Sequence, residues 1–284
     1  MSASEVAPIT SAEKSDQGAG RRIGVFDSGL GGLSVLRALR ARLPQAEILY
    51  VADSGHAPYG EKDLAHITER SLHISQFLID QGAQAIVVAC NTATAAAIHT
   101  LRQHWPDLPI IGVEPGVKPA VAASPYKRIG VLATPRTLAS EKFRDLVQRH
   151  GQNARITLQA CPGLAKEIEG GQLDTPRLRE LIAQFVQPLK DANVDTVVLG
   201  CTHYPFVSHL ITEALGPQVG IVDTAEAIAR RVAQQVAVLP EPSLSPGLSA
   251  QSGRTRLWTT GDPAHLSQTV QRWLGLDVEV SALP

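Results

Sequence analysis

Cysteine, aromatic residues and long apolar runs are all scarce in this chain of 284 residues. Its three cysteines are an odd number without the spacing of a disulfide framework, which is typical of a protein in a reducing compartment. No uncharged apolar stretch reaches about 18 residues, so the sequence predicts no membrane span. Residues 1–20 lack the apolar core of a secretory signal, and we interpret them as a disordered extension. We therefore expect a cytoplasmic protein.

Charge of one sign and the common cofactor motifs are also missing. The 26 basic and 27 acidic residues nearly balance, and no basic patch recurs, so we expect no nucleic-acid partner. The sequence has no C-x-x-C pair, and Cys201 and His203 do not have the spacing of a structural zinc site. The Gly-rich turn at 27–32 is neither a G-x-G-x-x-G fingerprint nor a P-loop. We therefore expect neither a metal ion nor a nucleotide cofactor.

Two of the cysteines occupy matching contexts. Cys90 and Cys201 each lie ten positions after an aspartate (Asp80 and Asp191) and directly follow a short apolar run with β-branched residues. Such a run predicts a buried strand, so each thiol is expected just past the carboxyl end of a strand. In open α/β sheets, that edge is where ligands bind.

The similarity between the two halves extends upstream. Residues 21–29 (RRIGVFDSG) resemble residues 127–135 (KRIGVLATP), and the following cysteine lies 63 residues after Asp27 and 68 residues after Ala133. Unrelated parallel sheets also share Val-rich strands, but agreement at both ends favours an internal repeat of two related α/β halves. The halves have diverged, because Ala133 stands where the first half has the acidic Asp27.

The order of the expected elements predicts parallel sheets, because strands and helices alternate. We expect strands at residues 23–26, 48–52, 85–89, 109–113, 129–132, 156–160, 196–199, 219–222 and 256–260. We expect helices at residues 34–43, 65–81, 94–104, 139–150, 175–192, 225–238 and 264–274. Residues 53–62 and 239–253 are rich in turn-forming residues and are expected to be loops. The tail beyond residue 253 is expected to return to the first half.

The cysteine pair is typical of an acid and a base that face one substrate from two sides. A thiolate is the reactive form, and a helix N-terminus lowers the pKa of a thiol. Both Cys90 and Cys201 precede an expected turn toward a helix. A single free cysteine is equally consistent with packing, since it is among the most buried residue types. A lone nucleophile with His203 as its base, as in an amidase or transferase, stays open but leaves the other cysteine unexplained.

The turn that starts at Asp27 and Ser28 has two interpretations. Its backbone amides can meet a carboxylate at the start of the following helix, with Asp27 as a charge beside the first thiol. Alternatively, the Asp27 carboxylate stabilises the turn and the Ser28 hydroxyl caps the helix. We favour function for both residues.

The residues that follow the two cysteines also carry polar side chains. The amide of Asn91 and the hydroxyls of Thr92 and Thr202 can bind the ammonium and carboxylate groups of an amino acid, or they can satisfy helix N-termini. Tyr59 and Gly60 offer a hydroxyl and a close backbone approach, or they form an ordinary turn.

Four motifs in order resemble those of the glutamate racemases, in the cofactor-independent aspartate/glutamate racemase superfamily. They are residues 24–32 (GVFDSGLGG), 53–60 (DSGHAPYG), 89–93 (ACNTA) and 200–205 (GCTHYP). The resemblance covers nearly all of residues 21–238. It implies two pseudo-symmetric α/β domains with parallel sheets and an active site in the interdomain cleft. It also implies interconversion of L-glutamate and D-glutamate for peptidoglycan synthesis, without pyridoxal phosphate or a metal ion.

The resemblance also implies roles for individual residues. Carried over by position, Cys90 and Cys201 are the acid/base thiols and Asp27 assists the first of them. Glu169 matches the carboxylate that assists the second thiol together with His203, although Glu167 competes for that role. The implied substrate contacts are Asp27, Ser28, Tyr59, Gly60, Asn91, Thr92, Thr202 and His203.

Domain boundaries and partners complete these expectations. Residues 21–115 with 223–284 are expected to form the first domain and residues 116–222 the second. We expect a homodimer that binds L- or D-glutamate, with a peptidoglycan precursor as a candidate activator. Two other functions stay open at this point. An aspartate racemase would use the same motifs, and a gyrase-inhibiting binding protein would use the same scaffold without needing paired thiols.

Overall fold

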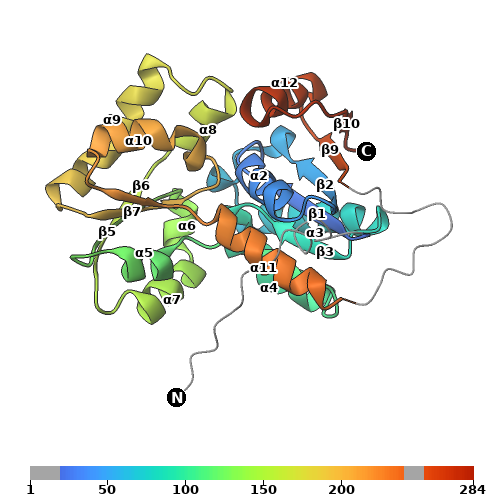
Figure 1. Cartoon of the computed structure of the whole chain (residues 1–284), viewed down its shortest axis with the longest axis horizontal. Helices are drawn as coiled ribbons and strands as arrows, with labels where there is room; N and C mark the ends of the chain where they lie inside the picture. Colours follow the sequence, from blue (N-terminus) through green and yellow to red (C-terminus); the bar gives the residue numbers. More distant parts are fainter. Residues whose placement is uncertain (1–19, 240–252) are drawn as a thin grey trace.

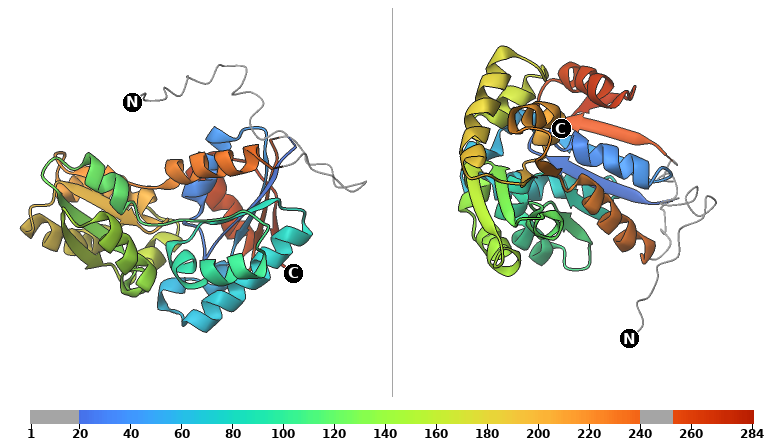
Figure 2. Two further views of the ribbon diagram at one scale, coloured as in Figure 1. Left: turned by 90° about the horizontal axis from the view of Figure 1, so that it is seen from below. Right: turned by 60° about the vertical axis from the view of Figure 1, so that its left-hand side comes forward.

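A computed structural model describes residues 20–239 and 253–284 of the chain. The expected extension before residue 20 and most of the expected loop at 239–253 lie outside the described residues. The chain forms two lobes, and each lobe is a parallel sheet with helices on both faces (Figures 1 and 2). The predicted α/β fold with two parallel sheets is therefore confirmed.

The larger sheet has six strands in the order β10-β9-β2-β1-β3-β4, and all its pairs are parallel. Its strands are β1 (Arg22–Asp27), β2 (Glu47–Ala52), β3 (Ala85–Val88), β4 (Ile110–Gly112), β9 (Thr255–Thr259) and β10 (Val280–Ala282). One face packs on α2 (Leu33–Arg42), α11 (Ala225–Ala237) and α12 (Pro263–Leu274). The other face packs on α3 (Leu64–Asp80) and α4 (Asn91–His104). The final strands β9 and β10 thus join the sheet that begins with β1.

The smaller sheet has four strands in the order β6-β5-β7-β8, again all parallel. Its strands are β5 (Arg128–Ala133), β6 (Arg155–Ala160), β7 (Thr196–Gly200) and β8 (Gly220–Val222). One face packs on α5 (Val117–Ala123) and α7 (Glu141–His150). The other packs on α8 (Leu164–Glu169), α9 (Pro176–Asp191) and α10 (Ser208–Leu215). The short helix α6 (Pro135–Ala139) follows β5.

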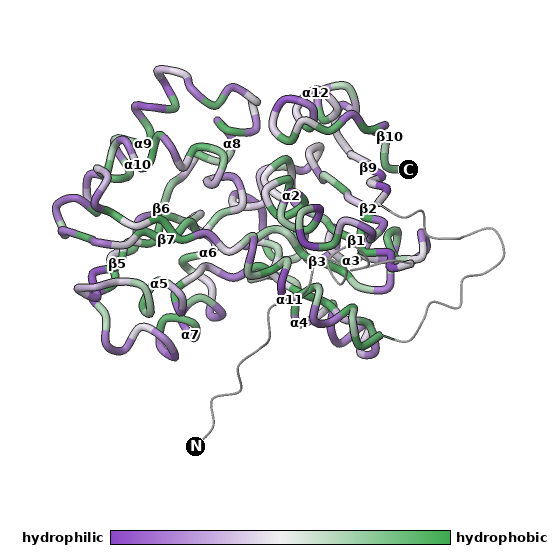
Figure 3. The backbone as a smooth tube through the Cα atoms, viewed as in Figure 1, coloured by the Kyte–Doolittle hydropathy of each residue, from purple (hydrophilic) through white to green (hydrophobic). Residues whose placement is uncertain are grey.

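The strand order supports the predicted internal repeat. The central strands run β2-β1-β3-β4 in one sheet and β6-β5-β7-β8 in the other, so β1 corresponds to β5 and β3 to β7. The central strands of both sheets are buried on both faces, as expected of parallel sheets covered by helices. Hydrophobic residues accordingly run along the strands in both lobes (Figure 3).

Several element boundaries differ from the sequence prediction for identifiable reasons. The sequence prediction missed α5, α6, α8, α10 and β10, which are short elements. The helix expected at 139–150 begins as α7 at Glu141, because the Ser140 hydroxyl caps it by accepting a hydrogen bond from the Phe143 amide at 3.1 Å. Helix α4 begins three residues earlier than expected, at Asn91, because Cys90 itself is its N-cap. Among the described residues, no helix has the length and apolarity needed to cross a membrane.

The packing of α2 against α11 gives a stability prediction. Leu36 on α2 is fully buried in the hydrophobic core that these two helices share. We expect Leu36→Ala to lower the free energy of unfolding by about 2–5 kcal/mol, because it removes buried methyl groups and leaves a cavity. Leu64→Ala, on a side chain that is 55% exposed, is the control and should change it by less than about 0.5 kcal/mol. Equal urea midpoints for the two variants would contradict this packing.

Candidate active site

The two matched cysteines lie at equivalent carboxyl ends of the two sheets. Cys90 follows β3 and caps α4, where its sulfur accepts a hydrogen bond from the Ala93 amide at 3.4 Å. Cys201 directly follows β7, ahead of the short helix η3 (Tyr204–Val207) and α10. Both thiols are nearly buried, at 5% and 7% exposure. The structure therefore places one buried thiol on each lobe, as the repeat predicted.

The Asp27 carboxylate ends β1 and is fully buried. Its Oδ2 accepts hydrogen bonds from the amides of Gly29 at 3.3 Å and Gly32 at 2.8 Å. Its Oδ1 has no hydrogen-bond partner among the described residues. Burial raises the pKa of Asp27, and this effect outweighs the opposing attraction of His203. One oxygen of this carboxylate is thus held by the turn, while the other is free to exchange a proton.

Cys90 lies beside the same turn. Its thiol donates to the Ser28 hydroxyl oxygen at 3.5 Å. Burial and the nearby Asp27 charge raise the pKa of the Cys90 thiol, although the Ala93 amide and Ser28 partly oppose them. A neutral thiol is therefore the resting form at neutral pH, and deprotonation requires a neighbouring base.

Cys201 has a different partner, His203. The Cys201 sulfur lies 3.5 Å from His203 Nδ1, and His203 Nε2 contacts the Glu169 carboxylate. Burial lowers the pKa of His203, but the charges of Glu169 and Cys201 and their hydrogen bonds outweigh burial and raise it well above the usual value. The imidazole thus lies between a carboxylate and a thiol. Among the described residues, the Glu167 side chain makes no such contact.

Glu169 and His203, from the second lobe, contact the Gly-rich turn after β1. Glu169 Oε1 accepts a hydrogen bond from the Leu30 amide at 2.6 Å. A Cβ on Gly29 would overlap the Glu169 carboxylate, and one on Gly31 would overlap the His203 ring. The turn therefore presents a backbone amide to a carboxylate, as one interpretation of the sequence expected. That carboxylate belongs to the protein itself.

Three threonine hydroxyls meet where the lobes touch. The Thr92 hydroxyl lies 3.1 Å from that of Thr134 and 3.4 Å from that of Thr137, and the latter two are 3.0 Å apart. All three residues are buried. Sequence analysis missed Thr134 and Thr137. The repeat held a signal for the first, because Thr134 follows β5 as Ser28 follows β1.

Asn91 and Thr202, two further predicted substrate contacts, also lie between the lobes. The Asn91 amide donates to the Val113 carbonyl at 3.4 Å, and Thr202 is buried beside Cys201 with its carbonyl accepting from Ser34 at 3.0 Å. A small pocket between the lobes is lined by residues that include Asn91, Cys201 and Thr202. Asn91 of the first lobe and Thr202 of the second thus line one small pocket.

Tyr59 and Gly60 form part of the boundary of the candidate site on the side of the first lobe. The Tyr59 ring is buried in the same hydrophobic cluster as Cys90, and its hydroxyl donates to Asp53 at 2.5 Å. A Cβ on Gly60 would lie 3.2 Å from the Thr134 Cβ, so the chain passes close to the second lobe there. The Tyr59 hydroxyl is therefore bonded to Asp53, while the Tyr59 ring belongs to the cluster that includes Cys90 and Gly60 lies next to Thr134.

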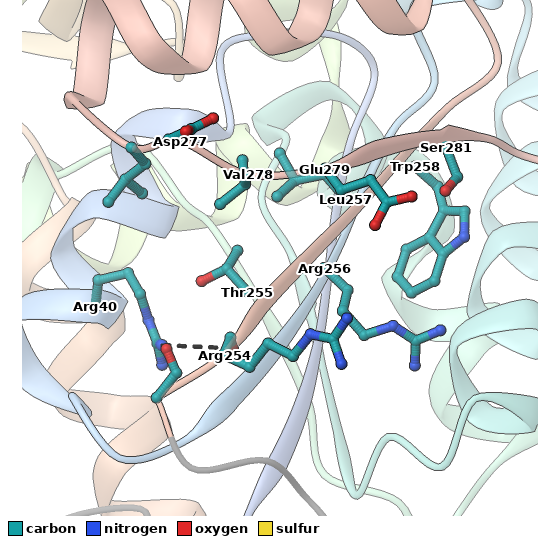
Figure 4. Close-up of a pocket in the computed structure, with 12 residues that line it drawn as sticks. Arg40, Arg254, Thr255, Arg256, Leu257, Trp258, Asp277, Val278, Glu279 and Ser281 are labelled. Carbon is teal, nitrogen blue, oxygen red and sulfur yellow. Dashed lines mark hydrogen bonds between the residues drawn. The ribbon is translucent and has the colours of Figure 1, made fainter.

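A larger pocket, of about 620 Å³, lies elsewhere (Figure 4). It is formed by β9 and the segment before β10, and its lining includes Arg40, Arg256 and Glu279 but none of the predicted site residues. Arg256 packs over the Trp258 ring and Arg40 donates to the Gly253 carbonyl at 2.7 Å, so both cations already have protein partners. The predicted site residues therefore do not line this pocket, although it is larger than the one that contains Cys201.

The part of the chain that the structure describes contains no metal centre. Within residues 20–239 and 253–284, no group of three or more His, Cys, Asp and Glu side chains is arranged to hold a metal ion. The arrangement instead places two separate groups of ionisable side chains, Cys90 near Asp27 and Cys201 near His203 and Glu169. Chemically, such a site can remove a proton from one side of a carbon atom and deliver a proton to the other side.

Comparison with known proteins agrees with this geometry. Residues 33–232 match the Asp/Glu/Hydantoin racemase family. Glutamate racemase from Ectopseudomonas mendocina is 47% identical over 91% of this chain and 96% of its own length. The crystal structure of glutamate racemase isoform RacE1 from Bacillus anthracis has a TM-score of 0.81 and 31% identity, covering 93% of this chain and 97% of that one. Escherichia coli glutamate racemase, in complex with L-glutamate and the activator UDP-MurNAc-Ala, has a TM-score of 0.82 and 29% identity, covering 93% and 98%. The chain therefore belongs to the Asp/Glu/Hydantoin racemase family and is, within it, a member of the glutamate racemases.

Proposed function

We propose that this racemase interconverts L-glutamate and D-glutamate by passing protons between Cα and two cysteines, with neither a metal ion nor an organic cofactor. The observation that carries the proposal is the placement of Cys90 and Cys201 at equivalent ends of two related sheets, each with its own proton partner. Inversion at a carbon requires one group on each of its two faces. The approximate symmetry of the lobes supplies two such groups.

The reaction is balanced in protons. One cysteine, as a thiolate, removes the Cα proton and becomes a thiol, and the electron pair stays on the substrate as a carbanion. The opposite thiol then donates its proton to the other face of Cα and becomes a thiolate. After product release, the protonation states of the two sulfurs are interchanged. Proton exchange with Asp27 and with His203 then restores the starting states. General acid–base catalysis of this kind contributes about 10²–10⁴-fold for each group.

Asp27 is proposed to set the protonation state of Cys90. The Cys90 thiol is neutral at rest because burial and the Asp27 charge raise its pKa. The free Oδ1 of Asp27 can take the thiol proton when Cys90 acts as the base. Hydrogen bonds to Oδ2 from Gly29 and Gly32 keep this carboxylate from rotating away.

His203 and Glu169 are proposed to serve the same purpose for Cys201. The raised pKa of His203 keeps a proton on its ring, 3.5 Å from the Cys201 sulfur. That proton is available to Cys201 after it has protonated the substrate. Glu169 fixes the orientation of the ring and stabilises its positive charge.

The polar groups between the lobes are proposed to bind the substrate. Hydroxyl, amide and backbone groups can hold the ammonium and carboxylates of glutamate and stabilise the charge that develops at Cα. The proposed contacts are the predicted set of Asp27, Ser28, Tyr59, Gly60, Asn91, Thr92, Thr202 and His203. The hydroxyls of Thr134 and Thr137 extend this set, because they are hydrogen-bonded to Thr92.

The wider context is also proposed. We assign residues 21–115 with 223–284 to the first domain and 116–222 to the second, which agrees with the sheet that each strand joins. Bacterial relatives support a cytoplasmic enzyme that supplies D-glutamate for peptidoglycan. The complex of the Escherichia coli enzyme with UDP-MurNAc-Ala supports activation by a peptidoglycan precursor. We propose a homodimer as the working assembly, to be checked by light scattering.

Incubation with each candidate substrate tests the proposed activity. We expect purified, reduced protein without added cofactor to abolish the optical rotation of L-glutamate, and of L-aspartate far more slowly. Faster reaction of L-aspartate would change the substrate and preserve the chemistry. No reaction with either amino acid, with and without the peptidoglycan precursor, would refute the proposal and favour a binding role.

Substitution of each catalytic thiol gives a second prediction. Cys90→Ala and Cys201→Ala should each lower kcat for racemisation in both directions by at least about 10²-fold, because each removes one of the two proton carriers. Cys161→Ala is the matched control, because it removes a buried thiol that lies outside the pair. Full racemisation by Cys201→Ala, measured by circular dichroism of the amino acid, would disprove the two-thiol mechanism.

The raised pKa of His203 gives a third prediction, concerning pH. Because Glu169 raises that pKa, the imidazolium persists to a higher pH than in a free histidine. Glu169→Gln removes this attraction, so the alkaline limb of the kcat profile should move to lower pH, and kcat at neutral pH should fall by about 10²-fold. Glu167→Gln is the matched control, two residues away on α8. Similar profiles for the two variants would show that Glu169 does not act on His203.

A further inference from the structure

The buried carboxylate of Asp53, which lies behind Tyr59 and Gly60, is not used by the proposed chemistry. Asp53 directly follows β2 and is fully buried. Its Oδ2 accepts from the Tyr59 hydroxyl at 2.5 Å and from Arg70 Nε at 3.0 Å. Its Oδ1 accepts from Arg70 Nη2 at 2.9 Å and from the Thr260 hydroxyl at 2.8 Å. Three side chains from different parts of the chain therefore converge on one carboxylate.

The Asp53 carboxylate is held as an anion. Burial would raise the pKa of Asp53, but the hydrogen bonds from Arg70 and Tyr59 outweigh burial and lower it. A buried charge is costly unless it is paired and hydrogen-bonded, and the planar fork of an arginine matches a carboxylate with two parallel bonds. Arg70, on α3, supplies that fork. It is the only cation within hydrogen-bonding distance of Asp53 among the described residues.

Tyr59 links this anion to the catalytic space. Its ring lies in the hydrophobic cluster that contains Cys90, while its hydroxyl is bonded to Asp53. Tyr59 also begins the short helix η2 (Tyr59–Glu61), whose Gly60 passes close to Thr134 of the second lobe. The position of Asp53 therefore determines where Tyr59 and Gly60 lie relative to the Cys90 thiol.

Thr260 connects the same anion to the end of the chain. It follows β9, and its hydroxyl both donates to Asp53 and accepts from the Gly55 amide at 3.0 Å. A Cβ on Gly55 would overlap the Thr260 carbonyl, so the two segments are in close contact. The returning C-terminal segment thus supports the loop that leads to Tyr59.

We infer that Arg70 and Thr260 are positioning residues for the substrate site, acting through Asp53 on Tyr59 and Gly60. The inference rests on the proposed function, in which Tyr59 and Gly60 contact glutamate. Neither Arg70 nor Thr260 touches the reacting atoms. Their loss should therefore weaken substrate binding and leave the proton transfers between cysteine and Cα much less affected.

Steady-state kinetics with L-glutamate test the inference. We expect Arg70→Ala to raise KM by about tenfold or more, the factor for losing a hydrogen bond to a charged group, with kcat lowered by less than about threefold. Arg70→Lys keeps the charge but loses the fork and should give an intermediate KM. Arg177→Ala is the matched control, because it breaks an exposed arginine–carboxylate pair on α9 and should leave both constants unchanged.

Chemical rescue separates positioning from a general loss of structure. The Arg70 side chain is 16% exposed, so guanidinium ions at millimolar concentration can enter the space that Arg70→Ala leaves. We expect them to lower the KM of that variant and not that of the Arg177→Ala control. A raised KM that guanidinium does not lower, or an unchanged KM in a folded Arg70→Ala protein, would overturn the inference.

Two milder variants keep the inference testable if Arg70→Ala does not fold. Tyr59→Phe and Thr260→Val each remove one hydrogen bond to Asp53 while preserving side-chain shape, and each should raise KM. Because both act through one carboxylate, their combined effect should differ from the product of the single effects. Calorimetric Kd values for L-glutamate provide a readout without turnover. Binding by a wild-type protein that does not racemise glutamate would contradict the proposed function alone, whereas unchanged KM and Kd in both variants would contradict the role of this network.

Discussion

The contact of Glu169 and His203 with the turn after β1 is the interaction on which the rest of the site depends. It crosses from one lobe to the other, and the Leu30 amide holds the carboxylate in place. Only glycine at positions 29 and 31 leaves room for the two incoming side chains. The same turn holds Asp27 through its amides. One short segment therefore sets the positions of Asp27 and of the Glu169–His203 pair.

The repeat explains the matched thiols and also the difference between their surroundings. Both cysteines follow corresponding strands, β3 and β7, so they reach the space between the lobes in equivalent ways. At the end of β1 the chain carries Asp27, whereas at the end of β5 it carries Ala133. The second thiol instead lies 3.5 Å from His203, two residues further along, which we propose as its proton partner. Nearly symmetric sheets thus carry two thiols with different neighbours.

Local patterns in the sequence predicted the strands other than β10, and the place of both thiols after their strands, because β-branched runs and strand-end turns depend on residues close together in the chain. The same patterns could not choose between Glu167 and Glu169, which lie on one short helix. That choice depends on which carboxylate reaches Leu30 and His203 across the lobes. Thr137 and the Asp53 network were missed for a similar reason, since each includes a partner that is distant in sequence, Thr92 for Thr137 and Thr260 for Asp53. The short helices α5, α6, α8 and α10 contain too few turns for a clear apolar period.

The most direct test of the two-thiol claim is the position of deuterium after a single turnover of L-glutamate in D2O. Two separate proton carriers predict that D-glutamate receives deuterium from solvent at Cα in its first formation, while the unreacted L-glutamate keeps its protium. Mass spectrometry of the separated enantiomers measures both. Transfer of the original protium into D-glutamate, or equal deuterium in the two enantiomers from the start, would show that a single group serves both faces and would contradict the mechanism.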